Sequence, residues 1–330
     1  MEGNFSLLTE PSSEHSIPQL SRTAYTAFAV YLGFVLILSL LGNGLFILTI
    51  VRNKHLQNAV NFLFVNICIA DMSVALFATP ITLMANVQGF WSFGPLVCRW
   101  YAFLSSLCGC EQIASIAAIA LQRYFFVVKY NLSARLTNGY AIACICFTWL
   151  YSLAAVIPPA IGWSEFTVEG GGTSCSVNWE SGDPSYIIFI FTLVLVIPLS
   201  IIIYSYGSIL STVKKMEKVS TLHRCRLRRA DKQVTTVAII LVLAFMITWG
   251  PYAVYSMYSA VGIGPPISPL LATLPSMFAK LSTAVNPFIY YLLHEKFRTA
   301  LFKSGRRSKN WLSQYNDPET KRQALKTSSL

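Results

Sequence analysis

The stretch that decides the fold class is Ala24–Val51, which reads AYTAFAVYLGFVLILSLLGNGLFILTIV and contains no charged side chain. A helix needs about 20 predominantly apolar residues to cross a membrane, and this stretch is longer than that. Similar stretches follow at residues 60–98, 99–123, 136–164 and 184–213, and at 233–279, which VGIGPPISP divides into two. Backbone polar groups in lipid must be satisfied within the segment, so helices are expected rather than strands. The sequence therefore predicts an all-α membrane protein, a bundle of seven transmembrane helices.

The composition agrees with a chain that lies largely in a bilayer. Of its 330 residues, 54% are hydrophobic and 12% are charged, whereas an average soluble domain is about 25% charged. With the N-terminus outside, the outer segments hold two basic side chains, Arg22 and Arg99, and nearly all other Lys and Arg lie inside. This asymmetry predicts a multi-pass protein of the cell membrane with an extracellular N-terminus and a cytoplasmic C-terminus. It also accounts for the net charge of +11 without a nucleic-acid partner.

The chain is expected to form one transmembrane domain at residues 25–294, with a short tail on each side. The outer tail, residues 1–24, carries a glycosylation sequon at Asn4. After the last span, HEKFRTALFKSGRR places apolar side chains near one face with basic ones beside them. This pattern predicts a short amphipathic helix along the membrane interface at residues 295–307. Residues 308–330 are polar and are expected to be a disordered cytoplasmic tail.

One lysine, Lys280, lies inside the last apolar stretch, PSMFAKLSTAVNPFIYYLL at residues 275–293. A charged side chain near the middle of a bilayer costs at least about 3 kcal/mol, and Lys280 is too deep to reach the outer surface comfortably. One interpretation is an ion pair with Glu111 or Asp71. The other is chemical, because a desolvated amine is a nucleophile that condenses with an aldehyde and so attaches a chromophore. The lysine by itself leaves both interpretations open.

Motifs in successive spans identify a family. They are GNGL with Asn43, NICIAD with Asp71, Cys98 followed by LQRY with Arg123, Trp149, Pro198 with Tyr206, FMITWGPY with Trp249 and Pro251, and NPFIY with Asn286, Pro287 and Tyr290. With these motifs in this order, almost the whole chain resembles the rhodopsin-like G-protein-coupled receptors. Lys280, seven residues before Pro287, matches the opsins within that family.

The resemblance implies a light-sensing receptor, not an enzyme, that binds retinal covalently as a Schiff base on Lys280, as the 11-cis or the all-trans isomer. Trp249 and Tyr252 share one face of the sixth span and are expected to pack against the polyene. Cys98 and Cys175 both lie on the outer, oxidising side, where a disulfide between them can form. The partners implied are a heterotrimeric G protein, arrestin, a receptor kinase and the lipid bilayer, and no metal is expected.

A charged linkage at Lys280 requires an anion. Opsins similar to the vertebrate visual pigments have a glutamate three residues after the cysteine of the third span, and here that position is Tyr101. The alternative family position lies in the second outer loop, six residues before the bridging cysteine, and Glu169 occupies it. We therefore expect Glu169 to be the counterion, with Tyr101 forming a hydrogen bond nearby, as in bistable pigments. Glu111 is the rival, and its more ordinary role is a hydrogen-bonded residue between the third and fifth spans.

Other motif residues are expected to act in activation. By family analogy, Arg123, Tyr206 and Tyr290 form contacts of the active state, and Asp71, Asn43 and Asn286 hold a polar network beside Pro287. The family usually has an acid immediately before the arginine of the third span, and here that residue is Gln122. Asp231, at the inner start of the sixth span, is a substitute partner for Arg123. The loss of the acid predicts raised activity in the dark.

Two other functions remain open. The first is a retinal photoisomerase that supplies 11-cis retinal, which Gln122 and the missing glutamate at Tyr101 both allow. The second is a receptor for a diffusible ligand, in which Lys280 binds a carboxylate. Transporters and channels are less favoured, because the sequence has neither an internal repeat nor a ring of pore-lining acids.

Overall fold

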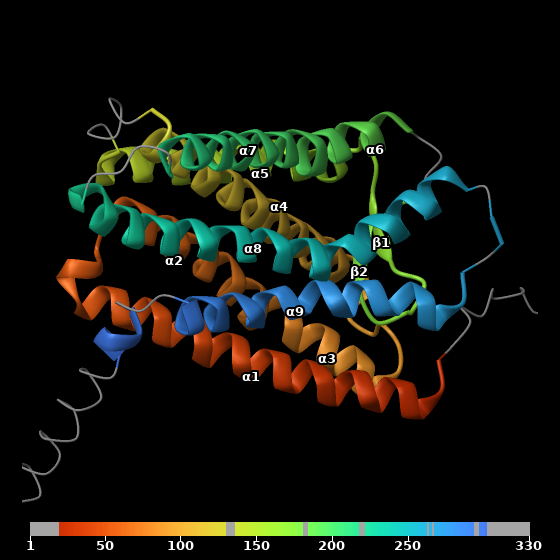
Figure 1. The fold of residues 1–330 in the computed structure, drawn as a ribbon. Coiled ribbons are helices and arrows are strands. Elements are labelled where there is room, and N and C mark those ends of the chain that lie inside the picture. Colours follow the sequence, from red (N-terminus) through yellow and green to blue (C-terminus); the bar gives the residue numbers. More distant parts are fainter. Residues whose placement is uncertain are drawn as a thin grey trace, which may run out of the picture.

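The computed structural model describes residues 20–129, 136–180, 184–217, 222–262, 264–265, 267–293 and 297–301, with side chains except at 215–217 and 222–232. Its long helices lie side by side in a bundle (Figure 1). They are α1 (Arg22–Arg52), α2 (Ala59–Ser73), α3 (Thr79–Gln88), α4 (Gly94–Val127), α5 (Asn138–Ala160), α6 (Pro184–Phe191), α7 (Ile197–Glu217), α8 (Leu222–Val261) and α9 (Pro269–Leu293). A short 3-10 helix, η1 (Lys54–Leu56), follows α1.

Six segments of the described chain are long and apolar enough to cross a membrane: residues 22–52, 59–88, 94–127, 138–160, 184–214 and 233–261. The seventh helix is α9, which is less apolar because it carries Lys280, Asn286 and several hydroxyl side chains, and it packs against α1 and α8. The outer face of α1 exposes large apolar side chains such as Phe34 and Leu41, as expected for contact with lipid. The predicted bundle of seven helices is confirmed.

Two spans contain a π-helical turn, and each turn precedes a proline. The second span is α2, η2 (Val74–Ala78) and α3, with Pro80 after the π turn, and the fifth is α6, η4 (Thr192–Val196) and α7, with Pro198 after it. Proline has no N–H to donate, so the helix before it loses a hydrogen bond. In the fifth span the Tyr151 hydroxyl donates to the Leu193 carbonyl at 2.5 Å. The motif proline Pro198 therefore closely follows a π turn that α5 contacts.

A third proline, Pro287, explains how α1 and α9 are joined. Because Pro287 has no N–H, the carbonyl of Thr283, four residues earlier, loses its partner within the helix. Asn43 and Ser39 on α1 supply donors instead, at 2.9 and 3.1 Å. The helices can approach this closely because Gly42 has no side chain, since a Cβ there would lie 2.9 Å from Cβ of Pro287.

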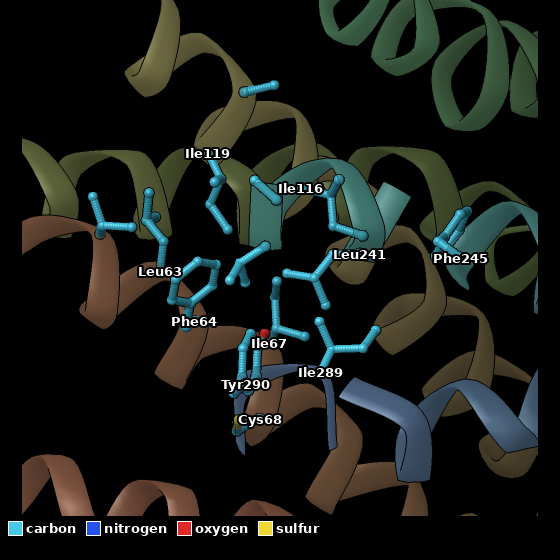
Figure 2. Packing of buried hydrophobic residues seen from close by; sticks show 14 of the residues in the cluster. Leu63, Phe64, Ile67, Cys68, Ile116, Ile119, Leu241, Phe245, Ile289 and Tyr290 are labelled. Atoms are coloured by element: carbon cyan, nitrogen blue, oxygen red, sulfur yellow. The ribbon is translucent and has the colours of Figure 1, made fainter. Parts of the chain in front are cut away.

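The largest apolar cluster lies at the end of the bundle away from the outer loops. Figure 2 shows side chains of α2, α4, α8 and α9 meeting there, among them Phe64, Ile67, Ile116, Leu241 and Ile289. The first four are at most 2% exposed, and Ile289 is 7% exposed. Packing between helices, rather than transfer from water, stabilises such contacts in a membrane. The cluster fixes the relative positions of the helices that also build the site described below.

A two-stranded antiparallel sheet, which the sequence analysis did not predict, lies at the outer end of the bundle. It consists of β1 (Phe166–Val168) and β2 (Cys175–Val177), with Val168 paired to Cys175. The predicted disulfide is present and joins Cys175 to Cys98 on α4. Figure 1 shows the sheet at the end of the bundle where α1 begins, next to α8 and α9. The second outer loop therefore covers the bundle instead of extending away from it.

Several predictions concern residues outside the described part of the chain. Asn4, residues 308–330 and the side chain of Asp231 belong to this group. Of the predicted interfacial helix, residues 297–301 are described and are helical. The ring of Phe297 stacks on Phe46 of α1 with centroids 4.6 Å apart.

Candidate functional site

An internal cavity brings together all five residues that were predicted to bind the chromophore. It lies between α4, α8 and α9 and is covered by β2 and the loop before it. The predicted residues on its wall are Lys280, Glu169, Tyr101, Trp249 and Tyr252. They come from four separate parts of the chain, so the fold alone brings them together.

Lys280 lies on α9 with its side chain in this cavity. Its Nζ is 5.8 Å from the centre of the Tyr101 ring, within the range of a cation–π contact. Among the residues that the structure describes, no carboxylate lies within 4 Å of Lys280. The suggested ion pairs with Asp71 and Glu111 are therefore not formed, and the amine lies on the wall of the cavity.

Glu169 lies at the hairpin turn with its buried carboxylate on the cavity wall. Its Oε1 accepts a hydrogen bond of 3.0 Å from the Tyr252 hydroxyl, and its Oε2 accepts one from the Ser174 hydroxyl. The backbone N–H of Glu169 donates to the Ser174 carbonyl at 2.8 Å. Trp179 in turn donates to the Tyr252 hydroxyl at 3.2 Å. The carboxylate is thus held by both the loop and α8.

The glycines that follow Glu169 let the loop lie directly on α9. A Cβ at Gly171 would lie 1.9 Å from Oγ1 of Thr273, and one at Gly170 would lie 3.2 Å from Cβ of Ala272. Gly172 has a φ of +70°, a conformation that residues with a side chain rarely adopt. A side chain at Gly171 or Gly172 would therefore strain the loop in this conformation, and the position of Glu169 depends on this close approach.

Aromatic side chains of α8 form a further wall of the cavity. The rings of Trp249 and Tyr252 are edge to face with centroids 6.1 Å apart, and Phe245 stacks on Trp249 at 5.8 Å. On the facing helix, Gly109 makes room for the indole, because a Cβ there would lie 2.5 Å from Cη2 of Trp249. The sequence analysis missed Gly109, and a glycine within an apolar span was the signal that could have found it.

The Tyr101 ring lies beside Lys280, but the Tyr101 hydroxyl does not bond to Glu169, near which its hydrogen bond was expected. Its hydroxyl accepts a bond of 2.7 Å from Thr82 of α3. Glu169 bonds to Tyr252 and Ser174 instead, so Tyr101 contributes its ring to the cavity.

The family follows from comparison with known proteins. Residues 42–290 match the family model "7 transmembrane receptor (rhodopsin family)". Pinopsin from Columba livia is 35% identical over 301 residues, which is 89% of this chain and 84% of that protein. Rhodopsin from Lethenteron camtschaticum is 31% identical over 287 residues, covering 84% of this chain and 80% of that one. The chain belongs to the animal opsins of the rhodopsin family.

Comparison with solved structures supports the same family. The crystal structure of squid rhodopsin superimposes with a TM-score of 0.81 and 28% identity, covering 92% of this opsin and 90% of that chain. This opsin is accordingly a multi-pass membrane receptor that senses light, and not an enzyme.

A polar network that includes two of the predicted residues, Asp71 and Asn286, adjoins the cavity of this opsin, and Asp71, Gln112 and Trp249 line the cavity. Asp71 accepts a hydrogen bond of 2.7 Å from Gln112 at Oδ1 and one of 2.9 Å from Asn286 at Oδ2. The Trp249 indole donates to Gln112 and to Ser282, each at 3.1 Å. Asn43, which was predicted to share this network, bonds instead to the Thr283 and Ser39 carbonyls.

Glu111 belongs to a separate buried cluster and does not line the cavity of Lys280. Its Oε1 accepts hydrogen bonds from Ser115 at 2.6 Å, from Thr148 at 3.0 Å and from Asn66. Asn66 is on α2 and Thr148 is on α5, so the residue bridges the second, third and fourth spans. The expectation that it lies between the third and fifth spans was wrong, because the side chain points toward the other side of α4.

Four of the residues predicted to act in activation, Arg123, Gln122, Tyr206 and Tyr290, are buried. The Arg123 guanidinium is 5.1 Å from the centre of the Phe126 ring, and Gln122 is 1% exposed. The hydroxyls of Tyr206 and Tyr290 are buried without a hydrogen-bond partner in the described part of the chain. Leaving such groups unpaired costs about 1–3 kcal/mol each, which favours any rearrangement that gives them partners.

Proposed function

We propose that this opsin binds retinal covalently through a Schiff base on Lys280 and activates a heterotrimeric G protein when it absorbs light. The observation that carries the proposal is the position of Lys280, an amine that forms no ion pair within the described part of the chain and lines a cavity with aromatic rings on its wall. An ionisable side chain within a membrane span is costly and generally has a function. A covalent chromophore gives it one.

The residues around Lys280 fit such a group. The aromatic walls formed by Trp249 and Tyr252 suit an apolar polyene, and the amine suits its aldehyde end. Glu169 supplies a negative charge on the same cavity wall, and both of its oxygens are held as acceptors. When bound, retinal supplies a change of shape on absorbing a photon. The protein's part is to attach it, exclude water and balance its charge.

Conversion of that change into a signal is proposed to begin at Trp249. The indole lies on the cavity wall and stacks on Phe245, which belongs to the apolar cluster at the inner end of the bundle. Packed interiors switch between discrete arrangements, so a displaced indole is expected to move the inner end of α8 outward. Tyr206, Tyr290 and Arg123 would then form new contacts around an opening for the G protein.

The remaining assignments also stand as proposals. The N-terminus is extracellular with glycosylation at Asn4, and the C-terminus is cytoplasmic, where arrestin and a receptor kinase act on residues 308–330. The placement of the disulfide and hairpin at one end of the bundle supports that end as the outer one, because disulfides persist in oxidising compartments. Asp231 is proposed to restrain Arg123 in place of the missing acid.

A second function, retinal photoisomerase, is favoured by one observation. Gln122, which is 1% exposed, stands where the family usually has an acid before the arginine of the third span. Measuring G-protein activation and the isomers of retinal released after illumination separates the two functions. Activation in the light favours the receptor, whereas turnover of all-trans to free 11-cis retinal without activation favours the photoisomerase.

The proposal is tested by reconstitution. Purified protein is incubated with 11-cis or all-trans retinal, and absorption spectra are recorded in the dark and after illumination. We expect a visible band that changes with light in the wild type. The matched control is Lys280→Arg, which keeps a cation in the cavity but cannot form the linkage, and we expect no such band from it. A wild type without a light-dependent band would refute the proposal.

A further inference from the structure

A groove opens between α4 and α7 at the end of the bundle opposite the two-stranded sheet. α4 is 34 residues long, or about 50 Å, and the disulfide at Cys98 lies near its start. The groove adjoins the other end of α4, at Tyr124, Val128 and Lys129. Its volume is about 480 Å³, within the range of about 300–1,000 Å³ that is typical of ligand sites. It shares no lining residue with the cavity of Lys280.

The groove carries one cation and several hydroxyl groups. Ser208 and Thr212 are four residues apart on α7, so their side chains share one face of that helix. Neither hydroxyl has a hydrogen-bond partner among the residues that the structure describes. Lys129, just beyond the end of α4, is exposed and forms no ion pair with a described carboxylate. No acidic residue of the described chain lines the groove. An ammonium group and free hydroxyls are donors that suit an anion.

The remaining wall of the groove faces the lipid. Ile203 and Tyr204 of α7 are 70% and 62% exposed, within a segment that is long and apolar enough to cross a membrane. Side chains exposed on such a span contact the hydrocarbon of the bilayer. Ser208 and Thr212 come later on α7, closer to Lys214, where that apolar segment ends. The groove therefore opens sideways toward acyl chains and has its donors nearer to the membrane surface.

We propose that this groove binds an anionic phospholipid. The phosphate of its headgroup is held by Lys129, Ser208 and Thr212, and an acyl chain lies along Ile203 and Tyr204. Charge and position both favour this ligand, because the cytoplasmic leaflet is rich in anionic lipids that attract basic side chains near its surface. A soluble anion would explain the donors but not the apolar wall that opens to the bilayer. The inference goes beyond the proposed function, because it requires neither retinal nor light.

Thermal unfolding of the full-length, retinal-free protein in a neutral detergent tests the site. Dioleoylphosphatidylglycerol, dioleoylphosphatidylcholine and inorganic phosphate are added separately, and the unfolding midpoint is recorded against concentration. A ligand that binds only the folded protein raises the midpoint by an amount set by its dissociation constant. We expect phosphatidylglycerol to raise the midpoint and the other two to have little effect. An equal rise with phosphatidylcholine, which has the same acyl chains, or with phosphate alone would overturn the proposal.

Removing the cation separates a defined site from general attraction between charges. Hydrogen bonds to charged groups are typically worth about tenfold or more in affinity. We therefore expect Lys129→Gln to raise the phosphatidylglycerol concentration needed for half of the shift by about tenfold. The matched control is Lys54→Gln, an exposed lysine of η1 at the same end of the bundle but outside the groove, which should change it by less than about twofold. Equal effects of the two variants would overturn the proposal.

Filling the groove tests its shape without changing its charge. A Cβ at Gly207 meets nothing within 4 Å, and leucine is a better helix former than glycine, so we expect Gly207→Leu to fold and to lose the response to phosphatidylglycerol. Gly44→Leu on α1, where a Cβ also meets nothing within 4 Å, is the control and should keep it. A wild-type response in Gly207→Leu would overturn the proposal. If that variant does not fold, Ser208→Ala combined with Thr212→Val replaces it, and a wild-type response there has the same meaning.

Discussion

The Tyr252 hydroxyl donates a hydrogen bond of 3.0 Å to Oε1 of Glu169, which joins α8 to the loop that covers the cavity. The same loop packs on α9 through its glycines, so α8 and α9 are both connected to the carboxylate proposed as the counterion. A movement of either helix would therefore alter the position of that charge. This connection explains why a short loop with a two-stranded sheet is part of the site and not merely a cover.

Replacing Glu169 should change the colour of the pigment. With Glu169→Gln, the positive charge on the linkage loses its partner, so we expect the linkage to lose its proton and the absorption at neutral pH to move into the ultraviolet. The control is Glu180→Gln, an exposed acid of the same loop, which should leave the visible band in place. A Glu169→Gln pigment that keeps the wild-type visible spectrum would contradict this role.

Removing the Tyr252 hydroxyl should produce a smaller effect of the same kind. Tyr252→Phe keeps the ring on the cavity wall but removes the donor to Glu169, which then retains Ser174. We expect a shift of the visible band with the pigment still formed, measured against Tyr255→Phe on the same helix. Equal spectra for the two variants would show that the bond does not position the charge.

Adding one methyl group to the loop should loosen the cover of the cavity. In Gly171→Ala the new Cβ would collide with Thr273 of α9, so the loop must move outward. We expect a lower yield of pigment and faster bleaching by hydroxylamine in the dark, because water-soluble reagents enter more easily. The second change Thr273→Ala removes the colliding hydroxyl and should restore part of the wild-type behaviour. A bleaching rate like that of the wild type in Gly171→Ala alone would argue against a tightly packed cover.

The close contact between α1 and α9 should be sensitive to side-chain size. In Gly42→Ala the added Cβ would lie 2.9 Å from Cβ of Pro287, and overpacking of this kind typically costs about 1–3 kcal/mol. We expect a lower thermal unfolding midpoint. Gly44→Ala on the same helix is the matched control, because a Cβ there meets nothing within 4 Å, and it should leave the midpoint unchanged or slightly raised. Similar midpoints for both variants would contradict the packing described.

Restoring the missing acid should reduce activity in the dark. Gln122→Glu places a carboxylate next to Arg123 and so adds a restraint on the inactive arrangement. We expect a lower rate of G-protein activation in the dark, while the rate in the light serves as the internal reference. An unchanged dark rate would show that the identity of residue 122 does not set the resting activity.

The number and order of the helices could be predicted from the sequence, because the length and hydropathy of a span are local properties. The pairing of Cys98 with Cys175 and the grouping of Lys280, Glu169 and Trp249 followed from motif positions that are typical of the family. Such predictions require only that each residue lie on a known helix or loop.

Other features depend on tertiary contacts that no local pattern reveals. The role of Gly109 is visible only once the Trp249 indole is placed against α4. Gln112 could not be told from an ordinary polar residue in a span, because its two partners lie on other helices. Glu111 was assigned to the wrong pair of spans because helix packing, and not the local sequence, determines which neighbouring span each face of α4 contacts. The hairpin was missed because its strands are three residues each, too short to show alternation.

The most direct test of the central claim is to locate the covalent bond. The protein is incubated with retinal in the dark, treated with borohydride to make the linkage permanent, digested and analysed by mass spectrometry. The account predicts one retinyl group, on Lys280, and none in Lys280→Arg. Absence of an adduct in the wild type, or an adduct on a different lysine, would contradict it.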